Sequence, residues 1–178
     1  IPYLLQNDGD LVGLAQTGTG KTAAFGLPLL ELLQPGDLPF ALILAPTREL
    51  CLQITSELKL FSKQMRNVRI SAVYGGSSVS KQRKELESGV DIIVATPGRL
   101  LDFIRRGVAR LEQLRVIVLD EADEMLQMGF IDDIRTILSE APKERKTWLF
   151  SATMPEAISR LTKDFMQNPH VVQVGKRN

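Results

Sequence analysis

Short apolar runs alternate along the chain with longer segments in which apolar residues recur every three or four positions. The runs have the length of buried strands, and the longer segments have the spacing of helices that bury one face. One such face carries Leu50, Ile54, Leu58 and Phe61. Regular alternation of strands and helices predicts a mostly parallel α/β sheet with helices on both faces. The seven predicted strands are Leu11–Ala15, Ala41–Ala45, Arg69–Val73, Asp91–Ala95, Val116–Asp120, Thr147–Ser151 and Val171–Val174.

A glycine-rich turn follows the first predicted strand and leads directly into a helix. Such a turn can wrap backbone N–H groups around an oxyanion, and the helix directs the positive end of its dipole at it. Lys21 would reach the β- and γ-phosphates, and the hydroxyl of Thr22 would hold Mg²⁺. An ordinary strand–turn–helix connection is the alternative. The predicted phosphate-binding residues are Ala15, Gln16, Thr17, Gly18, Thr19, Gly20, Lys21 and Thr22.

The first position of this loop departs from the usual phosphate-loop pattern, which begins with glycine. Ala15 stands there instead. Alanine can replace glycine only if the backbone at this position does not need a positive φ angle. The prediction of a phosphate loop therefore depends on the backbone conformation of Ala15.

A second segment with candidate catalytic residues begins at the end of the predicted strand Val116–Asp120. The apolar run passes straight into the carboxylates of Asp120, Glu121 and Asp123. At the carboxyl end of a parallel strand, Asp120 would face the same crevice as the phosphate loop and orient Mg²⁺ through its waters. Glu121 would polarise the attacking water. The alternative is an acidic helix N-terminus that the helix dipole stabilises.

Composition limits the classes of function. The chain has 178 residues, enough for one domain, and its net charge is only +1, so nucleic-acid contacts must come from a local surface. Cys51 and His170 are the only cysteine and histidine, which excludes a Cys/His metal cluster and an internal disulfide. No apolar run approaches the ~20 residues of a membrane span, and no signal-peptide pattern opens the chain. We expect a reducing, cytoplasmic compartment and no membrane partner. Both ends resemble cut edges of a longer protein.

The segment Asp120-Glu121-Ala122-Asp123, together with the phosphate loop, resembles the DEAD-box family of ATP-dependent RNA helicases in helicase superfamily 2. The resemblance covers essentially the whole chain, residues 1–178, as a single N-terminal RecA-like domain. Four further segments resemble motifs of the family in order and spacing: Pro46-Thr47-Arg48-Glu49-Leu50, Gly75-Gly76, Thr96-Pro97-Gly98-Arg99 and Ser151-Ala152-Thr153.

The resemblance implies roles for these segments. Thr47 and Pro97 suit the starts of helices after strands, so helix N-termini could track successive phosphates of one RNA strand. Asp123, Ser151 and Thr153 would couple the ATP state to RNA binding. The alternatives are well-capped helices and an N-cap formed by Thr153. The implied RNA-binding residues are Pro46, Thr47, Arg48, Gly75, Gly76, Thr96, Pro97, Gly98 and Arg99.

Two parts of the family pattern are missing from the sequence. The segment that recognises adenine would lie upstream of Ile1, and the second lobe with its arginine-rich motif would lie beyond Asn178. The resemblance therefore implies ATP, Mg²⁺, single-stranded RNA and a second lobe as ligands and partners of a monomeric enzyme. It also implies that this chain alone hydrolyses ATP slowly or not at all. A DNA translocase and a non-catalytic scaffold lobe are the competing classes.

Overall fold

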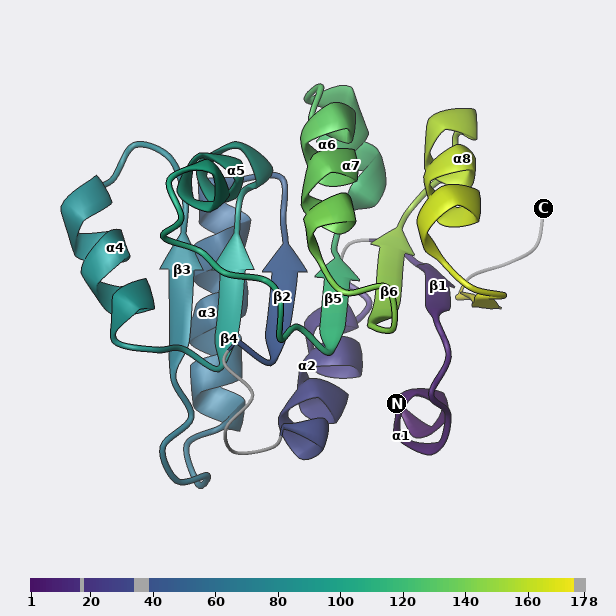
Figure 1. The fold of residues 1–178 in the computed structure, drawn as a ribbon. Coiled ribbons are helices and arrows are strands. Elements are labelled where there is room, and N and C mark those ends of the chain that lie inside the picture. Colours follow the sequence, from purple (N-terminus) through teal and green to yellow (C-terminus); the bar gives the residue numbers. More distant parts are fainter. Residues whose placement is uncertain (17, 34–38, 175–178) are drawn as a thin grey trace.

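The computed structural model describes residues 1–16, 18–33 and 39–174, and it contains one sheet of parallel strands. Seven strands lie side by side in the order β3-β4-β2-β5-β6-β1-β7 (Figure 1). The prediction of a parallel α/β fold is confirmed. The strands are β1 (Leu11–Leu14), β2 (Ala41–Leu44), β3 (Ile70–Val73), β4 (Ile92–Ala95), β5 (Val116–Leu119), β6 (Lys146–Ser151) and β7 (His170–Gln173).

Helices cover both faces of this sheet. One core cluster joins the sheet to α1 (Pro2–Gln6), α2 (Lys21–Leu32) and α3 (Arg48–Phe61). The opposite cluster joins it to the other helices, which lie in front of the sheet in Figure 1. These are α4 (Val79–Glu87), α5 (Pro97–Arg105), α6 (Ala122–Gln127), α7 (Ile131–Glu140) and α8 (Glu156–Phe165).

Strands β2, β4 and β5 are apolar at every position because both of their faces are buried. In β2, Leu42 and Leu44 belong to one core cluster, whereas Ala41 and Ile43 belong to the other. Successive side chains of a strand point to opposite faces, so a continuous apolar run can serve two helical layers. The same physics places Trp148 of β6 in the cluster with α1, α2 and α3, where it has no exposed surface.

The last strand begins one residue earlier than its apolar run predicts. The N–H of His170 donates to the carbonyl of Asp10 over 2.9 Å, and this bond starts the pairing of β7 with β1. All residues of β7, which forms one edge of the sheet, are exposed. The prolines and glycine of Pro35–Pro39 predict a break between the first helix and the second strand, and all of this segment except Pro39 lies outside the described residues. None of the described helices is both long and apolar enough to cross a membrane.

A buried carboxylate fixes the start of β1 and thereby the loop that follows it. Asp10 accepts hydrogen bonds from the N–H groups of Thr147 and Gln167, each over 2.6 Å. Burial raises the pKa of Asp10, and these two N–H groups oppose the rise. The side chain therefore ties the start of β1 to β6 and to the segment before β7.

Candidate nucleotide and nucleic-acid site

The strand order sorts the predicted motifs into two groups along the carboxyl edge of the sheet. The neighbouring strands β5, β6 and β1 lead into the acidic segment, the Ser-Ala-Thr segment and the phosphate loop. The neighbouring strands β3, β4 and β2 lead into Gly75-Gly76, Thr96–Arg99 and Pro46–Arg48. Along the sequence all three motifs of the second group lie between the phosphate loop and the other two motifs of the first group, and the strand order brings the first group together.

The phosphate loop has the backbone that its sequence requires. Gly18 and Gly20 adopt φ angles of 78° and 81°, which favour glycine, and α2 begins immediately afterwards at Lys21. Ala15 is not among the described residues with positive φ. Its N–H donates to the carbonyl of Ser151 over 3.0 Å and extends the β1–β6 ladder. Alanine therefore fits at the first position, and Thr17 lies outside the described residues.

Lys21 bridges the loop and the acidic segment. Its buried Nζ lies 3.4 Å from the carbonyl oxygen of Ala15 and 3.9 Å from Oδ1 of Asp120. The ammonium group thus lies between the predicted phosphate site and the predicted metal site. Thr22 follows at the start of α2 and lines the same cavity as Asp120.

Asp120 is a nearly inaccessible carboxylate, with 2% of its surface exposed. Burial raises its pKa to about 6, although the attraction of Lys21 opposes the rise; the nearby charge of Glu121 adds to it. A carboxylate with so little hydration favours a cation that replaces the lost water.

Glu121 has a backbone conformation that is uncommon for a residue with a side chain. Its φ and ψ are 53° and 52°, in the left-handed region, and its N–H donates to Oδ1 of Asp120 over 3.0 Å. Such conformations typically cost about 1–3 kcal/mol and cluster at functional sites. Glu121 stands at the N-cap position of α6 without a capping hydrogen bond from its side chain, and it lines a cavity of about 290 Å³ with Asp120 and Thr22.

Helix α3 supplies three residues to this cavity that were not predicted from the sequence. Leu50, Gln53 and Glu57 line it together with the phosphate loop, and Nε2 of Gln53 donates to Oε1 of Glu57 over 2.9 Å. Their spacing of three and four residues places them on one face of a helix. The sequence shows that spacing. It does not show that α3 lies beside the acidic segment, because α3 follows β2, the acidic segment follows β5, and these two strands are far apart along the chain.

The donor set suits a hard cation that binds together with phosphates. The described part of the chain holds no cluster of three His, Cys, Asp or Glu residues that could hold a metal by itself. The cavity does hold the Asp120 carboxylate and Thr22, both oxygen donors. Mg²⁺ is commonly bound by one or two such protein ligands, with waters and substrate phosphates completing its shell. The residues therefore fit Mg²⁺.

Asp123 lies at the centre of a hydrogen-bonded cluster next to this cavity. Its Oδ2 accepts from the N–H of Thr153 over 2.9 Å and from the hydroxyl over 2.8 Å, and its N–H donates to Oγ of Ser151 over 3.2 Å. Burial alone would raise the pKa of Asp123, but the hydrogen bonds from Thr153 and Ser151 outweigh it, so the pKa lies below its ordinary value. Thr153 does not cap the next helix, whose N-cap is Pro155.

The three loops beyond β2, β3 and β4 also lie close to one another. The hydroxyl of Thr47 accepts from the N–H of Leu50 over 3.2 Å and caps α3, as its sequence predicts. The guanidinium of Arg48 lies 5.1 Å from the centre of the Tyr74 ring. At Gly75 and Gly76 an added Cβ would meet nothing within 4 Å, so both glycines face open space. Pro46 is buried.

Thr96 does not cap its helix in the way that Thr47 caps α3. It stands at the N-cap of α5, but its side chain forms no capping hydrogen bond. Pro97 occupies the first turn and lacks an N–H, while the Thr96 N–H donates to the carbonyl of Val73 over 2.9 Å. Gly98 is exposed. Arg99 points towards the glycine loop, with Nη1 3.3 Å from the carbonyl of Ser77.

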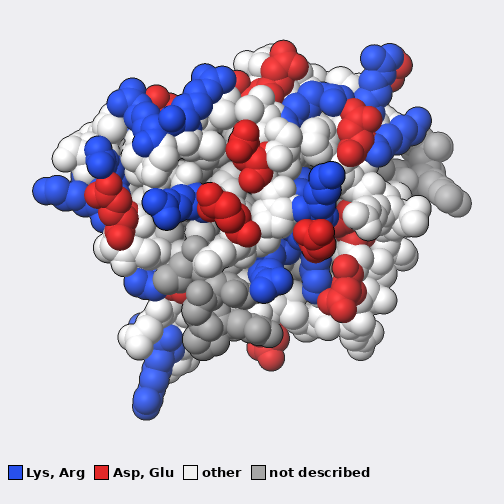
Figure 2. Space-filling view, in the orientation of Figure 1, with Lys and Arg blue, Asp and Glu red and all other residues white. Residues whose placement is uncertain are grey.

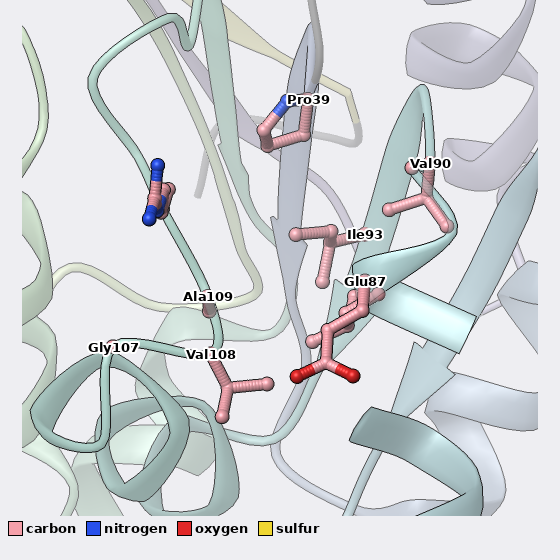
Figure 3. A pocket seen from close by; sticks show the side chains of 10 residues that line it. Pro39, Glu87, Val90, Ile93, Gly107, Val108 and Ala109 are labelled. Carbon is pink, nitrogen blue, oxygen red and sulfur yellow. The ribbon is translucent and has the colours of Figure 1, made fainter. Parts of the chain in front are cut away.

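A separate cleft of about 370 Å³ opens at the other end of the strands (Figure 3). Ile93 of β4 and Val90, which precedes β4, lie opposite Val108 there, and Glu87 contributes a carboxylate. None of the predicted site residues lines this cleft. It is therefore not the candidate site.

Charge does not single out a broad binding surface on the helical face shown in Figure 2. Acidic and basic side chains are interspersed there. This distribution agrees with a net charge of +1, and an anion site on this face would depend on local geometry.

A glycine-rich turn that leads into a helix, beside an acidic strand end on a parallel α/β sheet, is typical of nucleotide-binding proteins, and comparisons narrow that class. The sequence model described as "DEAD/DEAH box helicase" matches residues 1–161. The chain therefore belongs to the DEAD/DEAH box helicase family.

Named relatives agree with this assignment. The chain is 52% identical to "ATP-dependent RNA helicase DeaD" of Haemophilus influenzae, with 100% of the chain and 29% of that protein covered. It is 54% identical to "ATP-dependent RNA helicase CshA" of Listeria monocytogenes, with 93% and 32% covered. The structure of a DEAD box protein from Methanococcus jannaschii superposes with a TM-score of 0.92 at 42% identity, covering 97% of this chain and 47% of that one. The chain thus spans about three tenths of the length of these two curated relatives.

Proposed function

We propose that this chain is the N-terminal lobe, a single domain over residues 1–178, of an ATP-dependent RNA helicase. The observation that carries the proposal is the division of the sheet's carboxyl edge. Loops suited to phosphate and metal binding follow β5, β6 and β1, while loops suited to anionic backbone follow β3, β4 and β2. One rigid sheet can therefore hold a nucleotide and a nucleic acid side by side.

In the nucleotide half, the loop residues 15–22 bind the phosphates of ATP. The amides after Gly18 and the N-terminus of α2 hold phosphate oxygens, and Lys21 neutralises them from its position beside Asp120. Thr22 and Asp120 would hold Mg²⁺, with Asp120 acting through water. When bound, Mg²⁺ would neutralise charge that develops on the phosphate oxygens.

Hydrolysis in this proposal is in-line attack of a water on the γ-phosphorus of ATP. Glu121 orients that water and accepts its proton, because its carboxylate lines the same cavity as Lys21 and Thr22. The left-handed backbone of Glu121 supports this role, since strain of that kind fixes the direction of a side chain.

In the RNA half, Pro46, Thr47, Arg48 and the segment Thr96–Arg99 offer helix N-termini and guanidinium groups to successive phosphates. Gly75 and Gly76 allow the RNA backbone to approach closely, in keeping with the open space above them. Contacts of this kind position a strand without reading its bases. Contacts to 2′-hydroxyls would then distinguish RNA from DNA.

Asp123, Ser151 and Thr153 would transmit the state of the nucleotide to the RNA half. Their cluster joins the first turn of α6 to the end of β6, next to the phosphate loop. A network of this kind can rearrange when a neighbouring charge changes.

Full activity in this proposal needs a second lobe, because an arginine that stabilises the transferring phosphoryl group raises the rate by about 10³–10⁵. In the described segment after Ser151, Arg160 is already paired with Glu156 over 2.5 Å. The relatives are about three times as long as this chain, which leaves room for such a lobe. We expect the whole protein to act as a cytoplasmic monomer on single-stranded RNA and to open short duplexes.

The test is ATP turnover by the full-length protein that contains this chain, with RNA or DNA of the same sequence added. RNA should stimulate turnover and DNA should not. The 178-residue chain alone should turn ATP over slowly with either one. Equal stimulation by DNA would favour a DNA translocase, and absence of turnover in the full-length protein would favour a scaffold lobe.

A further inference from the structure

The amide of Gln82 is buried on the inner side of α4, with 4% of the residue exposed. Its Nε2 donates to the carbonyl of Tyr74 over 3.0 Å, and its Oε1 accepts from the N–H of Tyr74 over 3.2 Å. Both ends of the amide are therefore used, as a buried polar group requires. Tyr74 follows directly on β3, which is an edge strand. The Gln82 side chain therefore bonds the N–H and the carbonyl of Tyr74 in place of a neighbouring strand.

The same amide reaches a second loop. Oε1 of Gln82 also lies 3.4 Å from Nη1 of Arg99, which belongs to the loop after β4. The ring of Tyr74 in turn lies beneath the guanidinium of Arg48, from the loop after β2. Because β4 lies between β3 and β2, the series Arg48–Tyr74–Gln82–Arg99 connects all three loops.

These contacts hold both sides of the glycine pair. Tyr74 precedes the pair and is held by Gln82, while Ser77 follows it and accepts from Arg99. Gly76 has a φ angle of 75°, and neither glycine has a side chain that could restrict the loop. A glycine pair without such anchors samples many conformations, and ordering it on binding would weaken the affinity.

We propose that Gln82 is a positioning residue that preorganises the three loops of the RNA half for a phosphate backbone. This inference rests on the proposed function, because it concerns how the RNA half binds. It predicts that loss of the Gln82 amide weakens RNA binding and leaves ATP binding unchanged. A contact that only stabilises the fold would lower the free energy of unfolding and weaken the binding of RNA and ATP alike.

A matched control lies one turn further along α4. Oε2 of Glu85 accepts from the hydroxyl of Ser71 over 2.8 Å, and Ser71 lies within β3, away from the loops. The variant Gln82→Met removes the two hydrogen bonds between α4 and Tyr74, and Glu85→Met removes the hydrogen bond between α4 and Ser71. Only the first one touches the loops.

The experiment uses the full-length protein and measures binding of a fluorescein-labelled oligouridylate by anisotropy, with Mg²⁺ and a non-hydrolysable ATP analogue present. Gln82→Met should weaken RNA binding about fivefold or more, since two hydrogen bonds of an anchor are lost. Its affinity for the ATP analogue without RNA should stay within about twofold, and Glu85→Met should keep the RNA affinity of the wild type. Gln82→Glu retains the acceptor for Tyr74 and Arg99 and should lie between the wild type and Gln82→Met.

Three results would overturn the assignment of Gln82: unchanged RNA affinity in Gln82→Met, an equal loss of ATP-analogue affinity, or an equal RNA defect in Glu85→Met. Thermal unfolding of each variant identifies one that does not fold, and Gln82→Glu then decides the question. A wild-type protein that fails to bind the oligouridylate would instead overturn the proposed function.

Discussion

The buried carboxylate of Asp120 should make the protein less stable at neutral pH than a neutral residue would. Its pKa is raised from 3.8 to about 6, with burial as the largest cause. The folded state therefore binds a proton more tightly than the unfolded state, and stability falls as the pH rises through the window between these two values. A shift of this size corresponds to about 3 kcal/mol at pH values above the window.

The variant Asp120→Asn removes the titrating charge and keeps the shape of the side chain. The pKa of about 6 already includes the attraction of Lys21, so the lost ion pair needs no separate correction. We expect the free energy of unfolding of Asp120→Asn to exceed that of the wild type by up to about 3 kcal/mol near neutral pH, and the two to converge near pH 4.

Urea unfolding followed by circular dichroism, at several pH values and without nucleotide or Mg²⁺, measures this difference. The exposed residue Glu140 provides a control, because Glu140→Gln changes the net charge equally without a buried site. Equal stability of Asp120→Asn and wild type at neutral pH, or parallel pH profiles, would refute the reasoning. The same variant should bind ATP more weakly in the presence of Mg²⁺, so that stability and function change in opposite directions.

Three further substitutions separate the roles within the nucleotide half. Lys21→Ala should weaken the binding of a fluorescent ATP analogue about tenfold or more, because a charge-assisted contact is lost; unchanged affinity would remove Lys21 from the site. Glu121→Gln should keep that affinity within about twofold and lower single-turnover hydrolysis by the full-length enzyme about a hundredfold; equal losses would make Glu121 structural. Thr153→Val removes the hydroxyl that donates to Asp123; it should lower unfolding stability by about 1 kcal/mol and reduce RNA stimulation of turnover at unchanged ATP affinity. Unaltered stimulation would argue against coupling through Asp123.

Local patterns were sufficient to predict the fold class and the glycine-rich turn that leads from β1 into α2. Apolar runs such as Ala41–Leu44 are marked by hydrophobicity alone, because both faces of a central strand are buried. The turn is recognisable in the sequence because few residues other than glycine tolerate the φ angles of Gly18 and Gly20. Edge strand β7 was less well defined, since exposure removes the hydrophobic signal that marks a strand's ends.

Features that depend on strand order could not be predicted. Glu57 raises the pKa of Asp120 although the two residues lie far apart in the sequence, because β2 and β5 pair in the sheet. Gln82 is an ordinary polar residue within a charged helix, and only its burial against Tyr74 identifies it as an anchor. The left-handed conformation of Glu121 also has no local sequence signal, since glutamate rarely adopts it.

The central claim is that two neighbouring halves of one sheet edge bind different ligands, and amide hydrogen exchange of this chain tests it most directly. Saturating ATP with Mg²⁺ should slow exchange in the loops after β1, β5 and β6. Saturating oligouridylate should slow exchange in the loops after β2, β3 and β4. Protection of the same loops by both ligands, or protection by RNA confined to the loops after β1, β5 and β6, would contradict the account.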